Sequence, residues 1–125
     1  MKKDFMIYVD DILNSIEKIE NFCIGLDYNK FANNNLIIDA VIRNLEIIGE
    51  AVKKIPTNIK RRSDSIEWGK ISGMRDFLIH RYSDIDLEIV WDAIKNKLPK
   101  LKSVINKIKD DFTLYAKMRG IWKGL

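Results

Sequence analysis

The stretch LIIDAVIRNLEIIGEAVKKIP, residues 36–56, carries the clearest structural pattern in the chain. Its apolar residues recur every three or four positions, which predicts a helix from about Leu36 to Ile55 that ends before Pro56. The apolar stripe comprises Ile37, Val41, Leu45, Ile48 and Val52, extended by Ala40, Ile47 and Ala51. The polar strip formed by Arg43, Glu46 and Glu50 is expected to hold ion pairs along the helix.

The segment before this helix has the same periodicity and predicts another helix from about Asp4 to Cys23. Its first stripe consists of Phe5, Tyr8, Ile12, Ile16, Ile19 and Cys23, and a second apolar set consists of Met6, Val9 and Leu13. The second set widens the apolar face, so we expect this helix to contact two neighbours. Gly25 fits the end of the helix.

Residues 56–65 lack periodicity and predict a loop, after which a third helix is expected from about Ile66 to Arg81. Its inward side chains are expected to be Trp68, Ile71, Met74, Phe77 and Leu78. Gly69 and Gly73 each cost a helix about 1 kcal/mol relative to alanine, which predicts a closely approaching neighbour there.

A fourth helix is expected to begin at an N-cap formed by Ser83 or Asp84. Its stripe comprises Leu87, Val90, Trp91, Ile94, Leu98, Leu101, Ile105 and Ile108. Because Pro99 removes a helical hydrogen bond, we expect a kink there, or two helices that continue in register. The last residues, 110–125, predict a short helix of their own.

No strand-like alternation, repeat, glycine-rich phosphate loop or paired metal ligands appear in the sequence. The chain therefore predicts an all-α fold, an up-and-down bundle of four to five helices. We expect one helical domain over residues 1–109, followed by a C-terminal extension over 110–125.

The composition of the chain indicates its cellular compartment but does not identify a partner. The 22 basic and 18 acidic residues give a net charge of +4, which would tolerate a polyanion. Cys23, the sole cysteine, excludes an intrachain disulfide and favours a reducing compartment. Asp4, Asp10 and Asp11 interrupt the apolar region that a signal peptide would need, so we expect a cytoplasmic protein. The longest charge-free run, residues 31–38, is far short of the ~20 apolar residues of a membrane span.

The only histidine lies in the stretch RDFLIHRY, residues 75–82. On an ideal helix the directions of Arg75 and His80 differ by roughly 140°, so the two side chains project from different faces of one helix. Asp76 lies four positions before His80 and is expected to orient its ring. The structural alternative is a histidine stabilised at a helix C-terminus, with an arginine that pairs with a carboxylate.

Arg75-x4-His80-x-Tyr82 resembles the Arg-x4–6-His-x-Tyr motif of HEPN-domain proteins, specifically the HepT-like toxins of toxin–antitoxin modules. The resemblance covers about residues 4–101 and extends to the stretches DAVIRNLEIIGEA (39–51), ISGMRD (71–76) and IDLEIVWD (85–92). Residues from Asp110 onward have no counterpart in it.

This resemblance implies a helical homodimer with metal-independent endoribonuclease activity on RNA and no cofactor. His80 would be the catalytic histidine and Arg75 its phosphate-binding partner, while Asp76 matches the polar residue after the arginine. Because one histidine cannot easily be both base and acid, we expect a composite site across a two-fold axis.

Tyr82 stands where a nucleotidyltransferase (MNT) antitoxin attaches AMP in type VII systems of this kind. The added phosphate would repel an RNA backbone and neutralise the toxin. Two alternatives remain open: a non-catalytic HEPN module that binds a nucleotide or partner, and a plain helical interaction protein.

Overall fold

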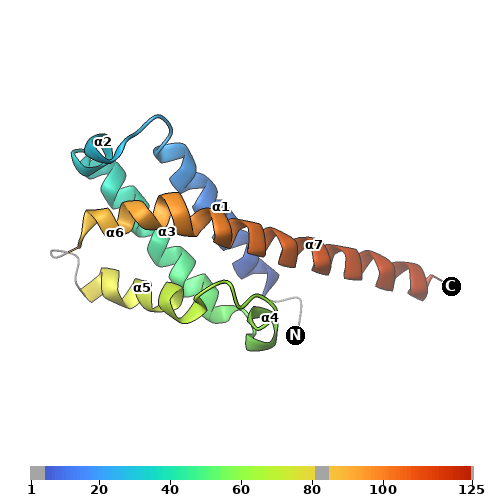
Figure 1. The fold of residues 1–125 in the computed structure, drawn as a ribbon. Helices are drawn as coiled ribbons and strands as arrows, with labels where there is room; N and C mark the ends of the chain where they lie inside the picture. The colour runs from blue at the N-terminus through green and yellow to red at the C-terminus, as the bar shows by residue number, and fades with distance from the viewer. Residues whose placement is uncertain (1–4, 81–84, 125) are drawn as a thin grey trace.

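The structure, a computed structural model, describes residues 5–80 and 85–124, without the side chains of Arg75, Ile79 and His80. Across these residues all regular structure is helical, so the all-α prediction is confirmed. The helices are α1 (Met6–Phe22), α2 (Tyr28–Ala32), α3 (Asn35–Lys54), α4 (Thr57–Lys60), α5 (Trp68–His80), α6 (Leu87–Asp92), the π-helical turn η2 (Ala93–Lys97) and α7 (Leu98–Lys123). The long helices run alternately up and down (Figure 1).

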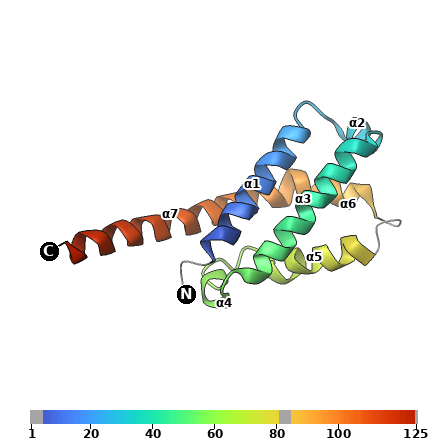
Figure 2. The same cartoon turned by 180° about the vertical axis from the view of Figure 1, so that it is seen from behind.

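Helix α3 is the central element and lies between α1 and α5 (Figure 2). It begins at Asn34, whose side-chain oxygen accepts a hydrogen bond from the backbone N–H of Ile37 at 3.0 Å. It ends at Ile55, whose backbone is extended before Pro56. The predicted helix over 36–55 is therefore confirmed.

Helix α1 packs against both α3 and α7, which confirms the expectation of two neighbours. It ends at Cys23, which is buried as expected, and Gly25 follows with a φ of +74°. Such a left-handed conformation favours glycine because it has no Cβ.

The loop prediction for residues 56–65 is wrong in its first part, because Thr57–Lys60 forms the single turn α4. Helix α2 was not predicted either; its N-cap Asp27 accepts a hydrogen bond from the Lys30 N–H at 2.8 Å. Phe31 of α2 is fully buried, with its ring centroid 5.1 Å from that of Trp91. These helices are too short for any periodicity to reveal them.

The cap of the fourth predicted helix also differs from the expectation. Asp86 is the N-cap of α6, and its carboxylate accepts a hydrogen bond from the Glu88 N–H at 2.9 Å. Ser83 and Asp84, the expected caps, lie outside the described residues. Capping residues are so frequent at positions 83–86 that sequence alone does not select among them.

The stripe from Leu87 to Ile108 continues through the region of Pro99, as expected. The π-helical turn η2 ends at Lys97, and α7 starts at Leu98, so Pro99 lies in the first turn of α7. Pro99 has no N–H, so the carbonyl of Lys95, four residues earlier, has no helical donor there. The wider π-helical turn accommodates this missing hydrogen bond.

Residues 110–123 are helical, but they form the last part of an unbroken α7 rather than a separate short helix. Figures 1 and 2 show this part projecting beyond the rest of the molecule. None of the helices within residues 5–80 and 85–124 is both long and apolar enough to cross a membrane.

Candidate active site

Helix α5 carries the backbone of Arg75 and His80, and its first turn is fixed by hydrogen bonds. The indole N–H of Trp68 donates to the carbonyl oxygens of Lys60 and Ser63, both at 3.0 Å. The Lys60 ammonium in turn donates to the carbonyl of Val52 at 3.1 Å. The end of α3, the turn α4 and the start of α5 are therefore tied together.

The other half of α5 is held against the bundle by Leu78, which is buried in the core. An ion pair adds a second connection, because the Lys53 ammonium on α3 lies 3.6 Å from the Asp76 carboxylate. Both side chains are partly exposed, so this pair positions α5 more than it stabilises the fold. Residue spacing did not predict Lys53 as the partner of Asp76, since the pairing depends on how two helices pack.

One face of α5 is not covered by the rest of the described chain. A Cβ added at Gly69 or Gly73 would meet no atom within 4 Å, so the expected close approach of a neighbour is wrong within this chain. Phe77 was expected inside but is 48% exposed. By helical spacing, positions 69, 73, 77 and 80 fall within about 80° of one another, so position 80 belongs to this open face.

The roles of Arg75, Asp76, His80 and Tyr82 in the predicted site stay predictions. The structure places the backbone of residues 75, 76 and 80 on one helix, whereas Tyr82 lies outside the described residues. Whether Asp76 orients His80 is therefore still a prediction, since the described contact of its carboxylate is with Lys53.

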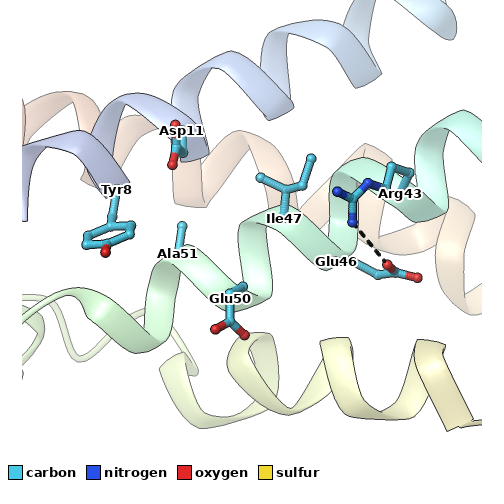
Figure 3. Close-up of a pocket in the computed structure, with 7 residues that line it drawn as sticks. All are labelled: Tyr8, Asp11, Arg43, Glu46, Ile47, Glu50 and Ala51. Carbon is cyan, nitrogen blue, oxygen red and sulfur yellow. Dashed lines mark ion pairs between the residues drawn. The ribbon is translucent and has the colours of Figure 1, made fainter.

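A cavity of about 260 Å³ lies between α1 and α3. Its lining residues are Tyr8, Asp11, Arg43, Glu46, Ile47, Glu50 and Ala51 (Figure 3). Arg43 and Glu46 form the expected ion pair at 3.6 Å, and Glu50 is directed toward α5. With three carboxylates around one guanidinium, this cavity disfavours phosphate groups.

A second cavity, of about 400 Å³, lies between α3 and the residues at the start of α6. It is lined by Asn35, Ile38, Asp39 and Ile42 of α3, and by Ile85 and Leu87. Ile85 follows Tyr82 by only three residues in sequence. Residue spacing does not predict this cavity, because its walls come from segments more than 40 residues apart.

Cys23 is not a candidate nucleophile. Burial raises the pKa of its thiol above the ordinary value, and the opposing effect of the nearby Lys95 is smaller. A thiol with a raised pKa holds little thiolate at neutral pH. No group of three or more metal-ligating side chains occurs in the described part of the chain.

Residues 12–108 match the family model described as "Ribonuclease HepT-like". The chain belongs to the HepT-like ribonuclease family. The match includes the whole Arg75–Tyr82 motif and ends before the projecting part of α7. The resemblance noted from the motif is thus confirmed at the level of the family.

Curated relatives of this HepT-like chain agree with the assignment. "Putative RNase MJ0125" of Methanocaldococcus jannaschii is 44% identical over 110 residues, which cover 88% of this chain and 95% of the relative. "Putative RNase MJ1216" of the same organism is 42% identical over 110 residues, covering 88% and 91%. "Probable ribonuclease HepT" of Thermococcus cleftensis is 39% identical over 109 residues, covering 87% and 99%. No solved structure matches the chain significantly.

Proposed function

We propose that this protein is a metal-independent endoribonuclease and the toxin of a type VII HEPN/MNT toxin–antitoxin system. The observation that carries the proposal is the intact Arg75-x4-His80-x-Tyr82 motif inside the family match over residues 12–108. Relatives named as RNases support the activity class.

The proposed reaction is attack of a ribose 2′-hydroxyl on the adjacent phosphate. One group must take the hydroxyl proton, another must protonate the leaving oxygen, and positive charge must stabilise the phosphorane. His80 has the side chain suited to proton transfer near neutral pH, and Arg75 has the permanent charge. Asp76 is proposed to orient His80, in addition to its ion pair with Lys53.

A homodimer would supply two histidines and two arginines to one cleft. The open face of α5 supports this proposal, because Gly69 and Gly73 leave space for a second backbone and Phe77 offers an exposed ring. Position 80 follows these residues along the same face, so a second copy that covered this face would also lie against position 80.

The test is cleavage of single-stranded RNA by protein whose mass shows no nucleotide adduct. Wild type should cleave with or without EDTA, and His80→Ala should lose about 100-fold or more of the activity. Lys70→Ala is the matched control, because Lys70 lies on α5 but its exposed ammonium pairs only locally, with Glu67 at 2.7 Å. Absence of cleavage by unmodified wild type would support a non-catalytic binding module instead, and cleavage by a proven monomer would rule out the composite site.

Tyr82 is the proposed control point. A cognate nucleotidyltransferase antitoxin would transfer AMP from ATP to the hydroxyl of Tyr82, with pyrophosphate as the leaving group. The added group would bring bulk and negative charge to a position close to Arg75 and His80 in the sequence. RNA phosphates would then be repelled from the site.

Intact-mass measurement after co-expression with the antitoxin should show increments the size of AMP. These should vanish in Tyr82→Phe but persist in Tyr115→Phe, a control at an exposed tyrosine on α7. Neutralisation of activity without any mass increment would refute the modification and indicate inhibition by binding alone.

A further inference from the structure

The last part of α7 exposes large side chains to solvent. Lys102 and Lys109 pair with Glu20 and Asp10 of α1 at 2.8 and 2.9 Å, and Phe112 packs edge-to-face on Phe5. Beyond Phe112 the large hydrophobic side chains that are exposed are Leu114, Tyr115, Met118, Ile121 and Trp122, each at least half exposed. This segment lies outside the family match, so its role is not inherited from the family.

The exposed side chains form two edges with different chemistry. Tyr115, Arg119 and Trp122 are spaced at i, i+4 and i+7, so they share one stripe of the helix, with the arginine between the two rings. Leu114, Met118 and Ile121 form a purely aliphatic edge beside it. Tyr115 and Trp122 are 57% and 71% exposed, and their rings are about 10 Å apart along the helix axis.

The charge of this segment is entirely positive. Residues 112–125 contain Lys117, Arg119 and Lys123 and no carboxylate. The positive charge continues onto the body, because the Arg62 guanidinium lies 6.0 Å from the centroid of the Phe112 ring at the base of the projection. Arg62 follows Lys60 and Arg61 in the sequence, so basic residues of the body lie near the base of the projection, where Asp110 and Asp111 also precede Phe112.

We propose that Tyr115, Arg119 and Trp122 form a binding surface for single-stranded RNA, separate from the cleavage motif. The proposal rests on the proposed ribonuclease function and deepens it, since the strand held here would be the substrate. Unpaired bases stack on exposed aromatic rings, while arginine contacts phosphate or stacks on bases. An aromatic–arginine–aromatic stripe in a segment without carboxylates combines both interactions.

A second copy of this segment is a poorer occupant. Lys117 and Arg119 flank the apolar side, each about 100° from Met118, so antiparallel pairing of two projections would bring like charges together. The phosphates of an RNA strand would instead be attracted to each of these cationic side chains.

The experiment measures binding by the full chain carrying His80→Ala, so that the RNA stays intact. A fluorescent single-stranded RNA of about 20 nucleotides is the probe, and anisotropy gives Kd at several salt concentrations. Tyr115→Ala and Trp122→Ala should each weaken binding about tenfold. Arg119→Ala should also lower the salt slope by about 0.7, the value for one phosphate contact on a single strand.

Leu114→Ala and Ile121→Ala are the matched controls, because they lie on the same exposed turns but on the aliphatic edge. Their Kd should stay within twofold of the parent. Equal Kd for all variants would overturn the proposal, as would equal losses on both edges. Binding to phosphatidylglycerol vesicles that depends on the aliphatic edge would overturn it in favour of a lipid surface.

Cleavage assays separate this inference from the proposed function. In chains that retain His80, the ratio of kcat/KM for the long RNA to that for a dinucleotide should fall about tenfold with Trp122→Ala. No cleavage of either substrate by unmodified wild type would refute the ribonuclease. Cleavage with an unaltered ratio would refute only the RNA-binding surface.

Discussion

Helices α3 and α5 pack side by side, yet they differ in how much of each is covered. Helix α3 has α1 on one side and α5 on the other, and its apolar stripe is buried within the chain. Helix α5 buries Leu78 but leaves Gly69, Gly73 and Phe77 facing open space. The comparison indicates that α3 serves this chain's own core, whereas α5 has one face suited to a partner.

The largest expected effect is on α3, where Leu45 has no exposed surface. Leu45→Ala should lower the free energy of unfolding by about 2–5 kcal/mol, because it removes buried methyl groups and leaves a cavity between packed helices. Urea denaturation followed by circular dichroism measures the change. A loss below about 1 kcal/mol would mean that α3 is no more tightly covered than α5.

Neighbouring residues of α5 sharpen the contrast. Leu78→Ala should cost about 2–3 kcal/mol, less than Leu45→Ala because a helix with an open side relaxes more easily around the cavity. Phe77→Ala should change the unfolding free energy of the monomer by less than about 1 kcal/mol, since its ring is half exposed. Both variants are measured by urea denaturation at low protein concentration. Equal losses of unfolding free energy would contradict the placement of Leu78 in the core and Phe77 on the open face.

Gly73→Ala should have opposite effects on the monomer and the proposed dimer. The added methyl meets open space within the chain, so the helix should gain up to about 1 kcal/mol. If a second copy packs there, the same methyl should weaken association, and sedimentation velocity would show dissociation at higher concentration. A stabilised chain with unaltered association would place the dimer interface elsewhere.

The smallest effect is expected at the start of α5, where Lys70 holds the pKa of the Glu67 carboxyl below its ordinary value through a hydrogen bond and charge attraction. Because the pKa is lowered in the folded state, the pair contributes its full stabilisation above the ordinary carboxyl pKa. This stabilisation is lost as the pH falls through the lowered pKa. The pair is fully solvated, so Glu67→Gln should leave the melting temperature unchanged at neutral pH. A clear loss at pH 7 that vanishes in acid would contradict this.

The contrast between α3 and α5 also explains which predictions succeeded. The bounds of α3 followed from its apolar period, the cap residue Asn34 and the stop at Pro56, all of which act locally. The stripe across Pro99 survived for the same reason. In α5 the apolar Phe77 was assigned to the core, because sequence does not distinguish a side chain buried by its own chain from one left for a partner.

For the candidate site, the motif located the segment but not its surroundings. The ion pair between Lys53 and Asp76 and the two cavities depend on helix packing, which residue spacing within one helix does not reveal. The projecting end of α7 was predicted as a separate short helix, whereas the adjoining helix already supplies the nucleus from which residues 110–123 continue.

The indole hydrogen bonds of Trp68 set the direction in which α5 leaves α4, and so the position of the motif at the other end of α5. Position 80 lies 12 residues farther along, about 18 Å from Trp68 along a straight helix, so a tilt of only about 3° at the indole would move it by about 1 Å. Displacements of that size are enough to cost an enzyme about 100-fold in rate. Trp68 lies far from the proposed chemistry. Trp68→Phe would nevertheless lower the rate by shifting the reacting groups out of alignment, although every motif residue would be unchanged.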